Sequence, residues 1–582
     1  MTRPTAASES VLPPVGSWRM GLRPGAWLAL HSVIMIAASP IFTMVGAWPL
    51  AFVSLVPCVV AALALKDAPR KAFVVAALGL IPWWFVTHAW LINVTVAGFF
   101  AVPFILSTFD AFAIFLTARL ARNHRTLALS AFPVFWTGLN YVRGEIAFDG
   151  YAWGWASHPL IDARVVAAPA CVIGGYGVTF LVAAFAAALV YAKQHTRNRR
   201  FLAPIGVGAA WALLSWFGVS QFSPSVPSIA APVRFAIVQT NVPQDNKLDW
   251  TIEQENRDFD RFRDLTLKAM EPQVGPDVVV WPETMAPGMT LAPQALKALS
   301  ENDIFVRHED GSRQWATAFA DSMLDLSATI KVPLIVGDSF IDNLSIHLTP
   351  DGKPVLDSDA RYNAAFVLRE GKIERQWYFK IHLTPFGEVM PYISSWPWLE
   401  RQLLSIGAKG MTFDLAAGTE PTVLTVPATD GRTIRCVTPI CFESTDSRLL
   451  RRLVFDKGIR RCDVIVNLTN DGWFTFSNLT RRQHLQAARW RSLETLTPTI
   501  RAANTGVSAL ISFDGSLIAS GVDDRSGASD IDGLLTGEVS PTSKVPPFAT
   551  IGNSLPLLCA AASGLSLLLH IGRSIRRKPT RT

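Results

Sequence analysis

Hydrophobic and polar positions divide the chain into three regions. Residues 25–220 carry long uncharged apolar stretches, whereas residues 233–545 mix charged, polar and apolar positions as a soluble domain does. A last apolar run, Ile551 to Ile571, precedes the basic end "GRSIRRKPTRT". Because a membrane-spanning helix needs about 20 mostly apolar residues, this pattern predicts a membrane protein whose soluble domain is set between transmembrane helices.

Eight segments have the length and composition of a spanning helix. They cover residues 26–43, 46–65, 72–92, 97–118, 126–142, 164–192, 201–220 and 550–571. The expected organisation is a cytoplasmic tail (1–25), a seven-helix transmembrane domain (26–220), a soluble domain (221–549), a C-terminal transmembrane helix (550–571) and a basic cytoplasmic tail (572–582). Asp110 lies inside an apolar segment, where a lipid-exposed carboxylate is costly, so we expect it to face the interior of the bundle.

Lysine and arginine residues are concentrated in every second loop, and the intervening loop 143–163 has a single arginine, Arg143, against Glu145, Asp149 and Asp162. The basic positions are Arg3, Arg19 and Arg23, then Lys66, Arg70 and Lys71, then Arg119, Arg122 and Arg125, then Lys193, Arg197, Arg199 and Arg200, and finally Arg573, Arg576, Arg577, Lys578 and Arg581. The short loops near 44–46 and 93–98 have neither residue. Since cytoplasmic loops are enriched in Lys and Arg, the pattern predicts two cytoplasmic termini and a soluble domain outside the cytoplasm, entered through the linker "SPSVPSIAAP".

Composition and cysteine spacing exclude several classes of site. Half of the residues are hydrophobic and only 17% are charged, which is low for a soluble protein. The net charge of +7 is explained by the basic loops, so nucleic-acid binding is not indicated. The six cysteines show no CxxC pair and no metal-ligand spacing, so we expect neither a disulfide nor a metal site.

The soluble region alternates between short β-branched runs and helical stretches. The runs are "VRFAIVQ", "DVVVWPE", "VPLIVGDS", "NAAFVLR", "TIRCVTPIC", "DVIVNL" and "GVSALISF", and the helical stretches include 252–271 and 481–495. This alternation predicts an α/β layer architecture.

Three reactive groups follow such runs. Glu283 ends "VVVWPE", Lys380 lies in "WYFKIHLTPFGE", and Cys441 ends "TPIC". Each is weak evidence alone, since a cysteine that ends an apolar run is most often a core residue. Together they form a consistent set, in which the carboxylate removes the thiol proton and the ammonium favours the thiolate and stabilises an oxyanion.

The same three segments resemble the nitrilase superfamily, whose Glu-Lys-Cys triad appears in this chain order. In that resemblance "WPE" supplies Glu283, "YFKIHLTPFGE" supplies Lys380 and "ICFE" supplies Cys441. It implies an αββα sandwich with Cys441 as the nucleophile.

Longer matches over nearly the whole chain resemble the apolipoprotein N-acyltransferase family. They include "FPVFWTGLNYVRG", "YAWGWASHPLID", "VQTNVPQDNK", "KIHLTPFGEVMP", "NLTNDGWF", "QHLQAARWRSLE" and "RAANTG". Leu248 and Phe442 depart from the family, which commonly has tryptophan and tyrosine there, and this affects the expected fit of the acyl donor. The stretch 288–330 looks longer than usual, as a lid or as a passive insertion.

This second resemblance implies a ping-pong reaction without metal or cofactor. Cys441 takes an acyl chain from a phospholipid as a thioester, and the N-terminal amine of a diacylglyceryl-cysteine lipoprotein then takes the chain as an amide. By the same resemblance Glu388 and Glu443 flank the triad and orient Lys380 or the amine, with ordinary structural pairing as the alternative. We expect Asn470, Asp471 and His484 to have a structural role, bracing the active-site loops. The protein is expected to be a monomer in the bacterial inner membrane, with its catalytic domain on the periplasmic side.

Two other functions use the same residues differently. A membrane-anchored amidase would have this triad with water as the acceptor, although a single anchoring helix would then suffice. A non-catalytic paralogue could bind lipoproteins or serve envelope assembly, although the intact triad argues against it.

Overall fold

The computed structural model describes residues 23–194, 201–222, 231–243, 251–284, 287–307, 311–350, 354–385, 387–389, 392, 398, 415–474, 477–521 and 532–576. Most of the two predicted cytoplasmic tails, most of the linker 223–232 and the position of Leu248 lie outside these residues.

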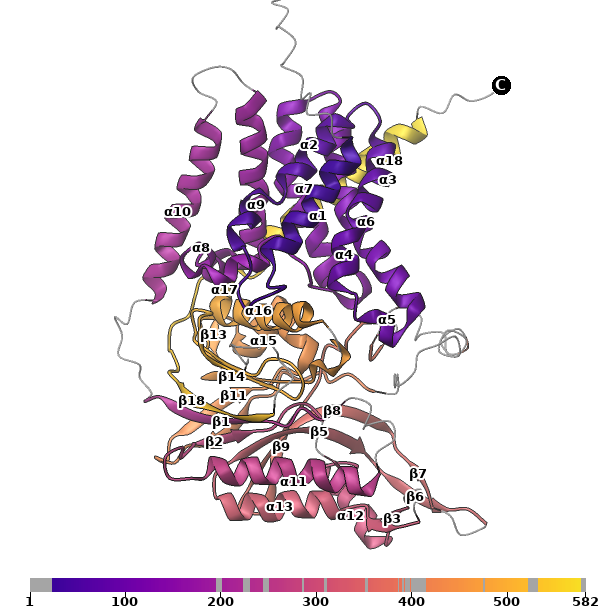
Figure 1. Cartoon of the computed structure of the whole chain (residues 1–582), viewed down its shortest axis with the longest axis vertical. Coiled ribbons are helices and arrows are strands. Elements are labelled where there is room, and N and C mark those ends of the chain that lie inside the picture. Colours follow the sequence, from indigo (N-terminus) through magenta and orange to yellow (C-terminus); the bar gives the residue numbers. More distant parts are fainter. Residues whose placement is uncertain are drawn as a thin grey trace, which may run out of the picture.

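The N-terminal part and the C-terminus form a helical bundle (Figure 1). Its elements are α1 (Pro24–Ala38), η1 (Trp48–Val53), α2 (Val56–Ala64), α3 (Pro69–Gly79), α4 (Ile81–Thr87), α5 (Leu91–Val94), α6 (Val96–Ala121), α7 (Arg125–Glu145), η2 (Ala147–Asp149), η3 (His158–Asp162), α8 (Arg164–Ala167), α9 (Ala170–Gln194), α10 (Leu202–Phe222), α17 (Phe548–Ile551) and α18 (Ser554–Arg576). Proline lies in the first turn of α1, α2 and α3, where its missing N–H leaves no helical bond unmade.

Five helices in the described part of the chain are long and apolar enough to cross a membrane. They are Pro69–Thr87, Val96–Ala121, Ala170–Gln194, Leu202–Phe222 and Ser554–Gly572. The shorter apolar helices Pro24–Ala38 and Trp48–Ala64, together with α7, occupy the other three predicted segments. The membrane character of the protein is therefore confirmed. The count of eight spans and the side of the membrane on which each loop lies stay predictions.

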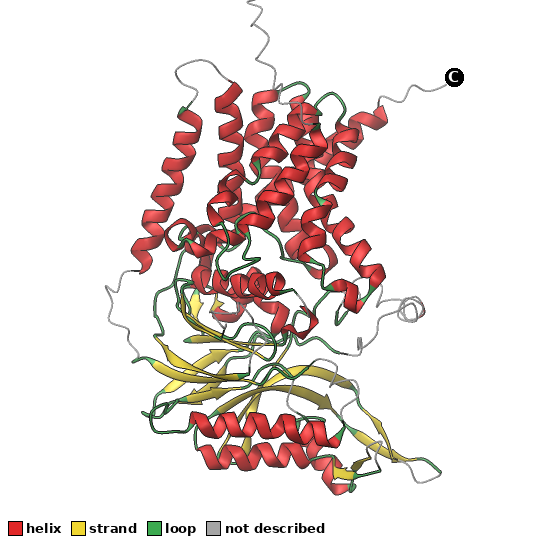
Figure 2. Cartoon of the chain, viewed as in Figure 1, coloured by secondary structure: helices red, strands yellow, loops and turns green. Residues whose placement is uncertain are grey.

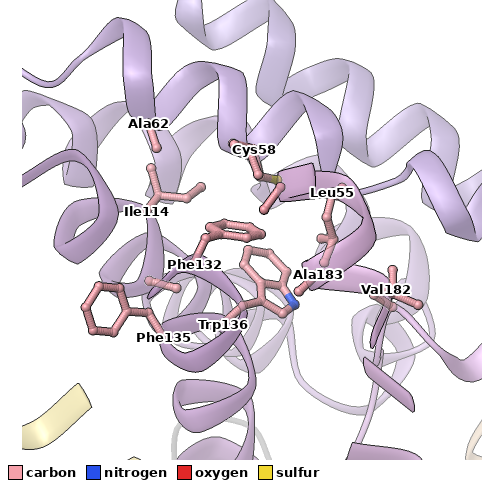
Figure 3. Close-up of a cluster of buried hydrophobic side chains, with 14 of the residues drawn as sticks. Leu55, Cys58, Ala62, Ile114, Phe132, Phe135, Trp136, Val182 and Ala183 are labelled. Carbon is pink, nitrogen blue, oxygen red and sulfur yellow. The ribbon is translucent and has the colours of Figure 1, made fainter. Parts of the chain in front are cut away.

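Apolar side chains from several helices pack together in the bundle (Figure 3), among them Leu55, Cys58, Ile114, Phe132 and Trp136. Asp110 is also buried, and its carboxylate accepts hydrogen bonds from Trp84 Nε1 (3.2 Å) and Asn140 Nδ2 (3.1 Å). The expectation that Asp110 faces the interior is thus confirmed, because two neutral donors replace the water that lipid cannot supply.

The soluble region contains two six-stranded sheets. The first has the order β18 (Gly533–Val539), β1 (Val233–Gln239), β2 (Val278–Val280), β5 (Leu334–Asp342), β8 (Ala360–Arg369) and β9 (Lys372–Phe379). The second has the order β10 (Leu424–Pro427), β11 (Thr433–Val437), β14 (Val464–Thr469), β15 (Thr499–Ala503), β16 (Ala509–Ile511) and β17 (Leu517–Ser520). Short ribbons pair β3 (Phe305–Arg307) with β4 (Arg313–Trp315), β6 (Ser345–Leu348) with β7 (Pro354–Asp357), and β12 (Phe455–Asp456) with β13 (Ile459–Arg460).

The two sheets pack face to face between two helical layers (Figure 2). Along β1, Phe235 and Ile237 point into the core shared by the two sheets, whereas Ala236 and Val238 point into the core beneath the outer helices. This alternation follows from the two-residue repeat of a strand, and burial on both faces explains why the strands read as continuous apolar runs. The outer layers are α11 (Ile252–Ala269) with α13 (Ala318–Ile330), and α15 (Ser447–Val454) with α16 (Asn478–Thr495). The predicted αββα sandwich is confirmed.

The stretch 288–330 belongs largely to one of these layers. It contains α12 (Pro293–Glu301), the β3–β4 ribbon and α13, whose Phe319, Met323 and Leu326 are buried against the first sheet. Figure 1 shows this part of the domain on the side away from the helical bundle. Helix α13 of this stretch is therefore part of an outer layer of the sandwich.

Helix α16 lies between the sandwich and the bundle (Figure 1), and its residues 479–495 are all buried. Its polar side chains reach the bundle: Trp490 Nε1 donates to the His158 carbonyl (3.2 Å), and Arg489 forms an ion pair with Asp162. In return, the Gly175 amide donates to Glu494 Oε1 (2.6 Å). The soluble domain is thus attached to the bundle by specific polar contacts as well as by the chain.

Candidate active site

Cys441 lies at the end of the second sheet, in a sharp turn. After β11 the chain forms one more bridge, between Ile440 and Leu468, and then enters the 3-10 turn η5 (Cys441–Thr445). Cys441 itself has a φ of +53°, in the left-handed region that costs a non-glycine residue free energy. The Cys441 side chain is half-buried. Burial raises the pKa of its thiol above the ordinary value, and the negative charge of Glu283 raises it further. The thiol therefore needs a base to become a nucleophile.

Glu283 follows β2 at the neighbouring end of the first sheet, and its side chain is buried. Glu283 Oε1 accepts a hydrogen bond from Asn363 Nδ2 (2.7 Å) and lies 3.4 Å from Lys380 Nζ, while Oε2 accepts one from the Asn470 amide (2.9 Å). The backbone of Glu283 passes so close to Gly337 of β5 that a Cβ there would lie 2.8 Å from Glu283 Cα. The carboxylate is thus held by Asn363 of the first sheet and by Asn470, which follows a strand of the second sheet.

Lys380 follows β9, and only 1% of its side chain is exposed. Its Nζ lies 2.7 Å from Glu388 Oε2 and 3.4 Å from Glu283 Oε1. Burial alone would lower the pKa of Lys380, but the carboxylates of Glu388 and Glu283 raise it above its ordinary value. Lys380 therefore remains an ammonium ion, which can stabilise negative charge that develops beside it.

Glu388 is the closest charged partner of Lys380, with 17% of its side chain exposed. Its Oε2 also accepts the Thr384 amide (2.8 Å) within the loop that follows the lysine. Burial alone would raise the pKa of Glu388, but Lys380 lowers it, so the carboxylate stays ionised beside the ammonium. The structure brings Glu388 to the position predicted for it, against Lys380.

Glu443 is fully buried and connects the cysteine turn to the lysine loop. Its carboxylate accepts hydrogen bonds from the Tyr378 hydroxyl (2.8 Å), the Ile381 amide (2.7 Å), the His382 amide (2.9 Å) and the Ile440 amide (2.6 Å). Burial raises the pKa of Glu443 in spite of these bonds. With four donors directed at it, this carboxylate positions the two loops rather than meeting a substrate.

Asn470 and Asp471 lie at the end of β14, beside Glu283. Asn470 contributes its backbone amide to Glu283, and Asp471 is buried with its Oδ2 accepting a hydrogen bond from Arg501 (2.8 Å). Asp471 Oδ1 lies 2.8 Å from His484 Nδ1, and His484 Nε2 lies 3.2 Å from the Cys441 carbonyl oxygen. The structure thus brings both residues, and His484, into the shell around the turn, as expected of bracing residues.

Several residues of this shell have no counterpart in the expectations from sequence. Asn363, Tyr378 and Arg501 all lie inside strands, where they read as parts of the runs "NAAFVLR", "WYF" and "TIRAA". Asn is depleted in strands, so the asparagine that begins the apolar run was the available signal.

Phe442, the residue after Cys441, connects the site to the bundle. The ring of Phe442 lies 5.4 Å from that of Tyr151, in an apolar cluster that includes Met35 of α1, Trp83 of α4 and Leu106 of α6. The cysteine turn therefore adjoins apolar side chains of helices of the bundle.

In the part of the chain that the structure describes, no group of three or more His, Cys, Asp and Glu side chains could hold a metal ion.

Comparisons with known proteins agree with this geometry. A family model described as Carbon-nitrogen hydrolase matches residues 234–540, which is more than half of the chain. The chain belongs to the carbon-nitrogen hydrolase family. A second family model, Apolipoprotein N-acyltransferase N-terminal domain, matches residues 32–188 of the bundle. Both predicted resemblances are confirmed.

Relatives of this carbon-nitrogen hydrolase family member match it over most of their length. The protein named apolipoprotein N-acyltransferase from Bradyrhizobium diazoefficiens is 27% identical, over 84% of this chain and 81% of its own. The protein of the same name from Rhodopseudomonas palustris is 26% identical, over 95% of this chain and 96% of its own. Among solved structures, an amidase from Nesterenkonia sp. covers 55% of this chain and 95% of its own at 13% identity, with a TM-score of 0.31.

Proposed function

We propose that this protein is an apolipoprotein N-acyltransferase, which moves an acyl chain from a phospholipid to the N-terminal amine of a diacylglyceryl-cysteine lipoprotein, as the last step of lipoprotein maturation. One observation carries the proposal. The thiol of Cys441, the carboxylate of Glu283 and the ammonium of Lys380 meet in the soluble domain, while Phe442 beside the thiol packs on apolar side chains of the bundle. A nucleophile placed there can meet a reactive group carried by a lipid.

In the first half-reaction Cys441 attacks the acyl ester of the phospholipid. Glu283 takes the thiol proton as the S–C bond forms, and the Lys380 ammonium stabilises the oxyanion of the tetrahedral intermediate. The ester C–O bond then breaks, and the proton passes from Glu283 to the departing alkoxide of the lysophospholipid. The product is a thioester on Cys441, which divides one difficult transfer into two easier steps.

In the second half-reaction the lipoprotein amine attacks the thioester. The C–N bond forms, Glu283 takes a proton from the nitrogen, and the same ammonium stabilises the second oxyanion. The C–S bond breaks, and the proton returns to the sulfur to restore the thiol. An amine that arrives as an ammonium ion releases one further proton to water.

The proposed location is the bacterial inner membrane, with the catalytic domain on the periplasmic side. The alternation of basic loops supports this direction, and the apolar helices support a multi-pass protein. The donor would be a phospholipid of the outer leaflet, the acceptor a diacylglyceryl lipoprotein, and the enzyme a monomer.

Mass spectrometry of a lipoprotein N-terminus tests the reaction. Purified protein in phospholipid micelles should add one acyl chain to a diacylglyceryl lipoprotein and form a hydroxylamine-labile acyl adduct. Cys441→Ala should do neither, whereas Cys462→Ala, which alters a buried cysteine of the same domain, should do both. Free fatty acid in place of acylated lipoprotein would favour the amidase-like hydrolase, and full activity of Cys441→Ala would overturn the nucleophile assignment.

A further inference from the structure

Asn363 contacts two members of the proposed triad from one position in the first sheet. Its side-chain Nδ2 donates to Glu283 Oε1 (2.7 Å), and its backbone carbonyl accepts the Lys380 amide (2.9 Å). Strand β8 lies between β5 and β9. Asn363 is therefore flanked on one side by β5, whose Gly337 contacts Glu283, and on the other by β9, which leads to Lys380.

We propose that Asn363 is a positioning residue, which orients the Glu283 carboxylate for proton transfer in both half-reactions. This inference rests on the proposed function for the role of Glu283. Each carboxylate oxygen of Glu283 has its own neutral donor. The side-chain amide of Asn363 donates to Oε1, and the backbone amide of Asn470 donates to Oε2, each in one short hydrogen bond. The Lys380 ammonium lies farther from Oε1, at 3.4 Å, and makes its short contact with Glu388 instead. Neutral donors, rather than the lysine, therefore fix the plane of the carboxylate.

The unpaired side of the Asn363 amide supports this role. Asn363 is buried, and its Oδ1 has no hydrogen-bond partner among the described residues. Turning the amide over would place that oxygen against Glu283 Oε1, so the charge of the base dictates the orientation. A buried acceptor without a partner lowers stability, and an apolar side chain would suit the middle of a buried strand better. The N–H directed at Glu283 is the one interaction of this side chain that offsets the cost.

Charged and titratable groups surround Glu283 and Cys441 on several elements. Lys380 approaches from the loop after β9, with Glu388 beyond it, while the Cys441 thiol comes from η5 and Asp471 from the end of β14. A neutral donor at Asn363 adds no charge to this set and holds Glu283 Oε1 by a hydrogen bond. Changing Asn363 to aspartate would place a second carboxylate against Oε1, and two adjacent carboxylates hold a proton more tightly than one.

The test is the pH dependence of Cys441 reactivity in the purified full-length protein. We expect Asn363→Asp to move the acid limb of two profiles to higher pH by about one unit or more: the alkylation rate of Cys441 with iodoacetamide, and the rate of acyl-enzyme formation from phospholipid micelles. Asn363→Leu should slow acyl-enzyme formation about 10- to 100-fold, and Asn363→Ser, which keeps a donor, should recover part of that loss.

Asn343→Asp is the matched control. Asn343 is exposed in the turn after β5, and its Nδ2 donates to the Asp359 carboxylate (2.8 Å), so the substitution makes the same charge change beside a carboxylate outside the site. Its profiles should match those of the unaltered protein. Profiles of Asn363→Asp equal to this control, or an undiminished rate in Asn363→Leu, would overturn the proposal.

The two proposals fail in different ways. Alkylation needs no acyl donor or acceptor, so it reports on Asn363 even if the unaltered protein transfers no chain to a lipoprotein. If Asn363→Asp does not fold, which its melting temperature would reveal, the Leu and Ser variants decide the question by their rates.

Discussion

The backbone amide of Ile381 donates a hydrogen bond of 2.7 Å to the Glu443 carboxylate, across 62 residues of chain. This bond connects the residue after the lysine to the residue two positions past the cysteine. Glu443 also accepts the Ile440 amide, so one carboxylate holds the backbone on the N-terminal side of Cys441 and on the C-terminal side of Lys380. This carboxylate therefore connects the turn that carries the thiol to the loop that carries the ammonium.

Glu443→Gln should disturb that connection. A glutamine amide directs a donor at groups that are themselves donors, so at least one of the four bonds must be lost and its partner left unpaired. We expect acyl-enzyme formation to slow on the order of 100-fold and the melting temperature to fall. Tyr378→Phe removes a single neutral donor and should cost about 10-fold or less. Equal rates in Glu443→Gln and in the unaltered protein, measured by single-turnover acylation, would contradict the connecting role.

Glu283→Gln should slow thioester formation, because the thiol then lacks its base. The same change removes one of the charges that raise the pKa of Cys441, so the pKa of the thiol should fall in this variant. Raising the pH should therefore restore part of the acylation rate by supplying thiolate directly. Single-turnover rates measured from pH 7 to pH 10 check this. A rate that does not change with pH would count against Glu283 as the base.

Lys380→Met should slow both half-reactions, because each passes through an oxyanion. The loss of one oxyanion donor typically costs about 100- to 1,000-fold in rate. The unaltered lysine stays protonated because its pKa is raised. Methionine supplies neither a charge nor an N–H donor at any pH, so higher pH should not rescue the variant. Acylation and aminolysis are measured separately in single-turnover experiments. Normal acylation with failure only at the amine step would refute the oxyanion role.

Asp471 should make the folded protein sensitive to acid. Burial alone would raise the pKa of Asp471, but the Arg501 guanidinium and the His484 imidazole lower it to about 2. A carboxyl whose pKa is depressed on folding stabilises the protein above its unfolded pKa of about 3.9 and loses that contribution as pH falls toward 2. The contribution is on the order of 2 kcal/mol. Melting temperatures between pH 6 and pH 3 should fall less steeply in Asp471→Asn than in the unaltered protein, and a parallel fall would contradict the expectation.

The direction in the membrane can be tested with reporter fusions. A reporter that is active only outside the cytoplasm should be active when inserted within residues 300–312 and silent when placed near Lys193. The opposite pattern would refute the argument from basic loops. A fusion at Arg122, in another loop predicted to be cytoplasmic, serves as a second silent control.

Local sequence was sufficient for much of the architecture. The runs around Val233–Gln239, Leu334–Asp342 and Val464–Thr469 were predicted as strands and are strands. A strand that is buried on both faces has a continuous apolar sequence, which can be recognised without knowing which strands it pairs with. The helical stretch 481–495 corresponds to α16. The predicted segment 72–92 is instead interrupted at Leu80, between α3 and α4, a break that hydrophobicity alone does not mark.

The chain by itself also predicted which residues carry the chemistry, since Glu283, Lys380 and Cys441 were identified from the strand ends and motifs in which they lie. Only the tertiary structure decided how these groups are held. Asn363 and Glu443 act on partners more than 60 residues away, and Phe442 touches a helical bundle encoded 291 residues earlier, at Tyr151. Hydrophobic periodicity reports whether a residue is buried, which is a local property. The partner that a buried polar atom finds depends on how two sheets and a bundle pack, and that packing is a property of the whole chain.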